Sequence, residues 1–208
     1  DGAPLVELLD LRDRYQTWLM LDDAHGIGVC GPNGQGSMAA LGLDNRQLDI
    51  YMATFGKALG VGGAMIAGKQ SLIDYIVNFS KPYIYTTAMP PAQAVAITAA
   101  IKLIQSQPWR QQQLHANIVY FKQLAQQHKL PLMASDSAIQ PILIGRSDVA
   151  LHVANALRQQ GFYCSAIRPP TVPSGTARLR ITLTAQHQPQ DIEQLLTALQ
   201  AILAAHHG

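Results

Sequence analysis

The chain has 208 residues, of which 48% are hydrophobic and 13% are charged, and its formal net charge is +2. This length and apolar content supply the core of one large domain or two small ones. A charge this small gives no strong attraction to nucleic acid or acidic membrane surfaces, and no apolar run approaches the ~20 residues of a membrane-spanning helix. We therefore expect a soluble, cytoplasmic protein with neither nucleic-acid nor membrane partners.

The first 91 residues alternate helices with short apolar segments. The run at 17–23 stops at two carboxylates, which is typical of a buried parallel strand whose functional end is its C-terminal end. The strands at 49–55 and 62–68, on the two sides of the loop that contains Lys57, are expected to be buried as well. Two prolines end the segment at 81–91, which favours an extended conformation there. The expected elements are helices at 4–15 and 69–80, strands at 17–23, 49–55 and 62–68, and an extended segment at 81–91.

After two helical stretches, the pattern restarts as a compact α+β unit with its own apolar periodicity. We place the domain boundary in the first of these helices, so that residues 1–92 belong to one domain. Residues 93–208 then form a helical connection and a small C-terminal α+β domain. The expected elements here are helices at 92–106, 109–128, 148–160 and 190–205, and strands at 138–145, 162–168 and 178–184.

The loop after the first strand contains "GIGVCG" at 26–31, which matches the G-x-G-x-x-G pattern of dinucleotide-binding proteins. In that motif a helix opens within the glycines and presents its N-terminus to a pyrophosphate. Here Pro32, Asn33 and Gly34 follow and prevent a helix from starting in time. The carboxylates that precede the glycines would also repel a pyrophosphate. The context therefore argues against a Rossmann oxidoreductase.

The residues around this loop suggest a different cofactor. Asp22 and His25 converge if the strand ends at Asp22, and the C-terminal end of a central strand is where α/β sheets place ligands. Lys57 stands between glycines after an apolar strand, where burial could lower the pKa of its amine and make it a nucleophile for a carbonyl. Thr54, three residues earlier, offers a hydroxyl to a phosphate oxygen. Together these groups indicate pyridoxal 5'-phosphate.

Each of these residues also has a simpler explanation. Asp22 could cap a solvated turn, Lys57 could be an ordinary surface lysine, and the Asp/Asp/His cluster could bind a metal ion. Cys30 and Cys164 lack the spacing of a disulfide framework or a zinc site, so we expect incidental thiols and no metal centre.

Four segments carry a family resemblance along essentially the whole chain. They are "LDDAHGIGVCGPNGQGS", "TFGKALGVGGA", "YIYTTAMPPAQA" and "AIRPPTVPSGTARLRITLTA". Together they resemble the α-oxoamine synthases, which are pyridoxal-phosphate enzymes of the aspartate-aminotransferase fold, and most of all the biotin-pathway member. The resemblance implies an α/β fold: part of a fold type I large domain with a mostly parallel sheet, plus a smaller C-terminal α+β domain.

The resemblance also implies roles for individual residues. Lys57 would be the Schiff-base lysine, Asp22 would pair with the protonated pyridine nitrogen, and His25 would hydrogen-bond the ring oxygen. Thr54 would bind the phosphate, as would Thr86 and Thr87 from across a homodimer interface, although both could be ordinary strand threonines.

Substrate roles follow from the same resemblance. Arg180 would hold the amino-acid carboxylate, for which a planar guanidinium is well suited. Arg178 shares its strand face by spacing, so the sequence leaves open which arginine faces the substrate. Thr171 and Arg168 would lie near the substrate, in a loop that could alternatively be a rigid connector.

The implied reaction is the condensation of L-alanine with an acyl-CoA, pimeloyl-CoA in the biotin pathway, with loss of CO2. Glycine-using relatives such as 5-aminolevulinate synthase or 2-amino-3-ketobutyrate CoA ligase are alternatives, as is a ligand-binding domain without catalysis. The resemblance covers the C-terminal half of a family member. The other half would supply the histidine that stacks on the cofactor, a glycine-rich phosphate-binding turn and part of the acyl channel. We therefore expect the 208-residue chain alone to be inactive, and either to associate or to be found with the other half bound as a separate piece.

Overall fold

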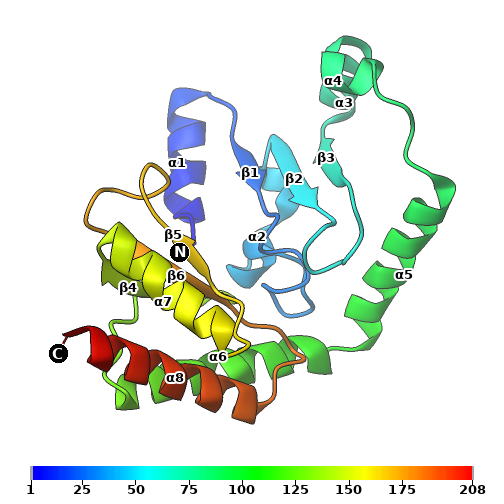
Figure 1. The fold of residues 1–208 in the computed structure, drawn as a ribbon. Coiled ribbons are helices and arrows are strands. Elements are labelled where there is room, and N and C mark those ends of the chain that lie inside the picture. Colours follow the sequence, from blue (N-terminus) through cyan, green and yellow to red (C-terminus); the bar gives the residue numbers. More distant parts are fainter. Residues whose placement is uncertain (1, 208) are drawn as a thin grey trace. The chain divides into compact units, whose positions relative to one another are not determined.

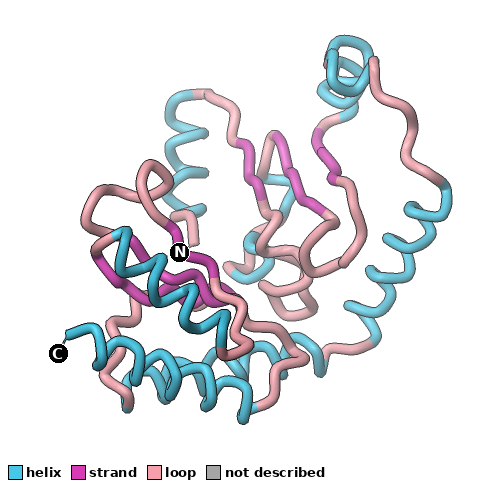
Figure 2. Tube along the Cα trace, in the orientation of Figure 1, coloured by secondary structure: helices cyan, strands magenta, loops and turns pink. Residues whose placement is uncertain are grey.

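The computed structural model describes residues 2–207, and within them the chain forms two compact units. One unit is Gly2–Gln111 and the other begins at Gln112; each contains a three-stranded sheet (Figures 1 and 2). Helix α6 (Trp109–Gln127) crosses from one unit into the next. The assignment of residues 1–92 and 93–208 to a large and a small domain stays a prediction.

The first unit places its helices around a short mixed sheet. Its elements are α1 (Leu5–Tyr15), β1 (Met20–Asp22), α2 (Ser37–Ala40), the 3-10 helix η1 (Asn45–Gln47), β2 (Ile50–Thr54), β3 (Ala64–Gly68), α3 (Gln70–Phe79), α4 (Lys81–Ile84) and α5 (Pro91–Ser106). Each helix and strand expected before residue 81 is present, with strand 17–23 shortened to three residues.

The sheet has the strand order β1-β2-β3. β1 and β2 are parallel, with Asp22 opposite Met52, whereas β2 and β3 are antiparallel, with Thr54 opposite Ala64. The C-terminal ends of β1 and β2 therefore meet at one edge, which we call the carboxyl edge. Parallel strands of α/β sheets bind ligands at this edge.

The core of the first unit lies on one face of β2. Residues alternate between the two faces of a strand, and Tyr51 and Ala53 are the buried residues of β2. They form a cluster with α1, β1 and α2 whose other buried members are Leu5, Leu9, Leu21, Met38 and Leu48. Burying this apolar surface fixes the end of β1 relative to β2.

β3 and the helix that follows it are largely uncovered. Met65 is half-buried and the other residues of β3 are exposed, and α3 has no buried residue. The prediction of buried strands on both sides of the Lys57 loop is therefore wrong for β3. It is one of the two edge strands of this sheet, and no helix of the first unit buries it.

The segment at 81–91 begins as a helix, so the prediction of an extended conformation is wrong for its first residues. Pro82 stands in the first turn of α4, where a proline ring fits because that N–H has no helical partner. Two further short helices, α2 and η1, were not predicted from the sequence. Each is no longer than four residues, too short for the apolar periodicity on which helix prediction depends.

The second unit is an antiparallel α+β arrangement. Besides α6 it contains β4 (Ile139–Gly145), α7 (Ser147–Gln159), β5 (Ser165–Ile167), β6 (Ala177–Thr182) and α8 (Pro189–His207). The strand order is β4-β6-β5, and both pairings are antiparallel. α7 packs on all three strands and on α8, so the core forms between sheet and helices. Its fully buried side chains include Phe121, Ile142, Leu157, Leu179, Leu196 and Leu199.

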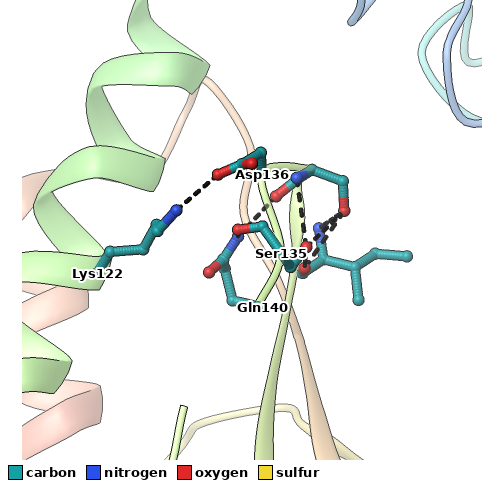
Figure 3. A network of polar contacts seen from close by, with 6 residues as sticks. Lys122, Ser135, Asp136 and Gln140 are labelled. Carbon is teal, nitrogen blue, oxygen red and sulfur yellow. Dashed lines mark hydrogen bonds and ion pairs between the residues drawn. The ribbon is translucent and has the colours of Figure 1, made fainter. Parts of the chain in front are cut away.

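A polar network stabilises the turn before β4 (Figure 3). Gln140 is fully buried, and its Nε2 donates to the carbonyl oxygens of Ser137 at 2.7 Å and Ser135 at 3.3 Å. Lys122 on α6 pairs with Asp136 of the same turn at 2.6 Å. The Gln140 side chain thus supplies a hydrogen-bond donor to two carbonyl oxygens of the turn, and paired backbone groups of this kind stabilise a folded chain.

Among residues 2–207, no helix has both the length and the apolar character needed to cross a membrane.

Candidate active site

Asp22 is the last residue of β1 and its side chain is exposed at the carboxyl edge. Its Oδ1 accepts a hydrogen bond from the backbone N–H of Ala24 at 3.0 Å, a local contact that favours a turn. His25 follows in this turn and is also exposed. The strand therefore ends at Asp22, as the convergence of Asp22 and His25 requires.

Lys57 lies in the loop between β2 and β3. Its Nζ donates to Oγ1 of Thr54, the last residue of β2, at 3.3 Å. The loop is closed by backbone hydrogen bonds from Phe55 to the Gly63 oxygen and from Val61 to the Phe55 oxygen, both 2.9 Å. The amine and the hydroxyl are thus held together at the carboxyl edge.

The loops that follow β1 and β2 contact each other. Gly28 has a φ of +78°, and a Cβ atom at this position would lie 2.7 Å from Cβ of Ala58. Only glycine permits this approach, because any side chain would be both strained and in collision. The structure therefore brings Asp22, His25, Thr54 and Lys57 to one edge of one sheet.

The environment of Lys57 differs from the expected one. The side chain is exposed, because the loop borders β3, whose own residues are largely uncovered. Within this chain, burial does not remove water from the amine.

Thr86 and Thr87 are not brought to the carboxyl edge of the same chain. Both are exposed and follow α4, and the Thr86 hydroxyl donates to the carbonyl oxygen of Pro82. β3 leads away from the carboxyl edge, and α3 and α4 lie beyond its far end (Figure 1).

The expected substrate residues belong to the second unit. Arg180 is exposed on β6, on the face opposite to Leu179, and Arg178 shares that face. The guanidinium of Arg178 donates to the carbonyl oxygen of Thr176 at 3.0 Å, whereas no hydrogen bond or ion pair engages that of Arg180 within residues 2–207. This difference favours Arg180 as the arginine that is free to bind a carboxylate.

Arg168 and Thr171 are exposed in the loop between β5 and β6. The backbone N–H of Thr171 donates to the carbonyl oxygen of Arg168 at 3.0 Å. The two residues therefore belong to one tight turn.

Asp23 is 2% exposed, and its role in the site was not predicted from the sequence. Its carboxylate accepts hydrogen bonds from Ser37 and from the hydroxyl of Tyr51 at 3.0 Å. Burial, the Asp23 charge and the Tyr51–Asp23 hydrogen bond raise the pKa of Tyr51. The pKa of the half-buried Cys30 thiol is also raised, first by burial and then by the Asp23 charge. The sequence does carry one signal for this role. Adjacent residues of a strand point to opposite faces, so of two acids at a strand end, one faces the interior.

No group of three or more His, Cys, Asp or Glu side chains in the described part of the chain is arranged to hold a metal ion.

Comparisons with known proteins place this geometry in context. The family described as aminotransferase class I and II matches residues 2–199. An 8-amino-7-oxononanoate synthase of Saccharophagus degradans is 46% identical over 208 residues, which cover 100% of this chain and 52% of the relative. The enzyme of the same name from Aeromonas salmonicida is 49% identical over 214 residues, covering 100% of this chain and 54% of the relative. The chain thus spans about half the length of these curated relatives.

Solved structures agree with the sequence comparisons. A serine palmitoyltransferase from S. paucimobilis with a bound PLP–myriocin aldimine superposes with a TM-score of 0.91 at 28% identity, over 99% of this chain and 52% of that chain. An 8-amino-7-oxononanoate synthase from Francisella tularensis gives a TM-score of 0.84 at 27% identity, over 97% of this chain and 59% of that chain.

Proposed function

Because the chain belongs to the aminotransferase class I and II family, we propose that it forms part of an 8-amino-7-oxononanoate synthase. The protein would condense L-alanine with pimeloyl-CoA, release coenzyme A and CO2, and yield 8-amino-7-oxononanoate for biotin biosynthesis. The observation that carries this proposal is the identity of 46–49% to enzymes of that name along the entire chain. The fold is the mixed α/β fold of type I PLP-dependent transferases.

The groups at the carboxyl edge fit pyridoxal 5'-phosphate by their chemistry. Asp22 offers an exposed carboxylate for a protonated pyridine nitrogen, and Lys57 offers an exposed amine for an aldehyde. Thr54 offers a hydroxyl for the phosphate and His25 an imidazole for the ring oxygen. When bound, the cofactor supplies an electron-withdrawing ring that stabilises a carbanion at the amino-acid Cα.

Lys57 has two tasks in the proposed reaction. It would hold the cofactor before the substrate arrives, and once released it would remove the Cα proton of the amino acid as a general base. The Thr54 hydroxyl accepts a hydrogen bond from Nζ at 3.3 Å, which restrains the lysine near the end of β2. A restrained amine needs less reorganisation before proton transfer.

Asp22, at the end of β1, and His25, in the turn that follows, would contact the cofactor ring. A carboxylate hydrogen-bonded to the pyridine N–H stabilises its protonated form, because a nearby negative charge favours the positive partner. The Ala24 N–H, which donates to Oδ1 of Asp22 at 3.0 Å, orients this carboxylate and leaves Oδ2 for the ring. His25 would tune the ring oxygen by a hydrogen bond.

The second unit supplies the proposed substrate contacts. Arg180 would bind the carboxylate of L-alanine through its planar guanidinium, whose paired N–H groups match two carboxylate oxygens. Thr171 and Arg168 would contact the substrate from the neighbouring turn.

We further propose a homodimer in the cytoplasm, in which Thr86 and Thr87 reach the phosphate bound by a second copy. The supporting observation is that both threonines are exposed and closely follow α4, which lies beyond the far end of β3 from the carboxyl edge (Figure 1).

The deciding experiment uses the protein at the length of its relatives, incubated with PLP, reduced with borohydride and digested for mass spectrometry. We expect the phosphopyridoxyl group on Lys57 and its loss in Lys57→Ala. Modification of Lys69 or Lys81 instead would overturn the assignment.

Release of coenzyme A from pimeloyl-CoA should then be compared with L-alanine, glycine and L-serine. L-Alanine should give the highest kcat/KM. A preference for glycine would select another α-oxoamine synthase, and PLP binding without turnover would indicate a ligand-binding protein.

A further inference from the structure

We propose that Asp23 is the positioning residue of this site: its buried carboxylate ties the loop at 24–36 to β2 and thereby holds Asp22 and His25 at the carboxyl edge. The inference rests on the proposed function only for what Asp22 and His25 bind there. The role of Asp23 in holding the loop rests on contacts within the first unit alone.

Asp22 and Asp23 leave β1 on opposite faces. The backbone N–H of Asp23 donates to the carbonyl oxygen of Met52 at 2.8 Å, a hydrogen bond of the Asp22–Met52 pairing at the end of β1. Because side chains alternate along an extended chain, the exposed Asp22 faces the site and the buried Asp23 faces the interior. Because the two residues are adjacent, a change in the backbone dihedral angles that displaces Asp23 also displaces Asp22.

Three donors from two elements converge on the Asp23 carboxylate. Oδ1 accepts from the hydroxyl of Ser37 at 2.5 Å, and Oδ2 accepts from the Ser37 backbone N–H at 2.9 Å and from the Tyr51 hydroxyl at 3.0 Å. Ser37 follows the glycine loop directly and Tyr51 belongs to β2. The carboxylate thus connects both ends of the loop to the neighbouring strand, through hydrogen bonds strengthened by its charge.

The glycines of the loop are required by this carboxylate. A Cβ atom on Gly26 would lie 1.9 Å from Oδ1 of Asp23, and one on Gly36 would lie 2.1 Å from Oδ2. The backbone therefore wraps around the carboxylate from both sides. This contact explains part of the glycine pattern at 26–36 without a pyrophosphate.

The test compares Asp23→Asn with a matched control in the same unit. An amide keeps the size of the carboxylate but removes its charge, so the hydrogen bonds from Ser37 and Tyr51 lose their charge-assisted strength. Its N–H₂ group must also face the Ser37 hydroxyl, which then has to accept where it now donates. The control is Asp49→Asn. Asp49 accepts a 2.9 Å hydrogen bond from the Leu19 N–H, directly before β2 and away from the carboxyl edge.

The first measurement needs no cofactor. Hydrogen exchange of the 208-residue chain, followed by mass spectrometry of peptides, should show residues 24–36 exchanging at least about fivefold faster in Asp23→Asn. Asp49→Asn should leave that segment unchanged. Equal exchange of the loop in Asp23→Asn and in the unsubstituted chain would overturn the proposal.

The second measurement separates positioning from general support. In the protein at the length of its relatives, Asp23→Asn should raise the Kd for PLP by about tenfold. In an Asp22→Asn background, the same substitution should change the Kd by less than about threefold, because the residue through which it acts is already altered. Full additivity of the two effects would overturn the proposal.

A milder variant covers the case in which Asp23→Asn fails to fold. Ser37→Ala removes one of the three donors and should shift loop exchange and Kd in the same direction by about two- to threefold; no shift would overturn the proposal. If the unsubstituted protein does not bind PLP, the proposed function fails, whereas hydrogen exchange still decides whether Asp23 holds the loop.

Discussion

The two adjacent carboxylates at the end of β1 show how one strand gives neighbouring residues different tasks. The Asp22 side chain is exposed and, within residues 2–207, accepts one hydrogen bond, from the Ala24 N–H. Asp23 is buried and accepts three. A residue whose polar atoms are free at the surface can bind a ligand, and one whose polar atoms are fully engaged contributes to structure.

Asp22→Asn should act through charge and not through packing. We expect PLP binding to weaken by about 1.5–3 kcal/mol, the usual cost of losing a hydrogen bond to a charged group. The free energy of unfolding should change by less than about 0.5 kcal/mol, because the amide oxygen still accepts from Ala24 and the residue is exposed. An absorbance titration and a urea melt check both values, and loss of stability with unchanged PLP affinity would contradict this expectation.

Tyr51 should make stability depend on pH in alkaline solution. Burial, the Asp23 charge and the hydrogen bond to it raise the pKa of this phenol above its ordinary value of about 10. The neutral folded form is therefore favoured below pH 10, and stability falls as pH rises above that value, because only the unfolded chain releases the proton. Urea melts at pH 9 and 11 should show this loss in the unsubstituted chain and a smaller loss in Tyr51→Phe; equal losses would exclude the effect.

At the scale of elements, the contact between the loops after β1 and β2 should be sensitive to one methyl group. Gly28 and Gly60 both have a positive φ, but a Cβ on Gly28 meets Ala58 at 2.7 Å, whereas nothing lies within 4 Å of one on Gly60. Gly60→Ala should cost about 1–2 kcal/mol from backbone strain alone. Gly28→Ala should cost about 1–3 kcal/mol more, from overpacking. Urea melts of the two variants compare them directly, and equal costs would mean that the loops separate easily.

The sequence predicts elements better than it predicts their surroundings. Strands 49–55 and 62–68 were located from apolar runs, yet β2 is half-buried and β3 is exposed. The difference depends on which elements cover each face, and a local pattern does not contain that information. The expectation that Lys57 is desolvated is wrong for the same reason: it assumed buried strands on both sides of the loop, and the side chain is exposed.

The candidate site was predicted in part. Asp22, His25, Thr54 and Lys57 do meet at one edge, because parallel strands place their C-terminal ends together. The role of Asp23 was not predicted, because its partners, Ser37 and Tyr51, lie 14 and 28 residues further along the chain. Their convergence follows from tertiary packing, which spacing alone does not reveal.

At the scale of the whole molecule, apolar surface is unevenly distributed. All but four of the large hydrophobic side chains exposed within residues 2–207 belong to the first unit. On α3, Tyr75 and Phe79 are 62% and 64% exposed, and their stacked rings lie 4.7 Å apart. Exposed apolar patches of this kind favour association.

We therefore expect the 208-residue chain to associate through the first unit. Replacing Tyr75 and Phe79 together by Gln should lower the mass measured by light scattering and the binding of an apolar dye. Tyr163→Gln in the second unit is the matched control, because Tyr163 is 81% exposed and should leave the mass unchanged. An unaltered mass in the α3 variant would place the contact elsewhere.

The antiparallel pairing of β2 with β3 also determines the order in which the site is assembled during folding. Residues 55–63 join these two strands, whereas residues 23–49 separate β1 from β2. Closing the shorter loop costs about 1 kcal/mol less entropy, so the hairpin that carries Lys57 should form first. In a pulse-labelling experiment during refolding, the amides of β2 and β3 should then be protected before the amide of Asp23, whose hydrogen bond to Met52 reports the arrival of β1. Lys57 would thus be in place before β1 brings Asp22 to the carboxyl edge.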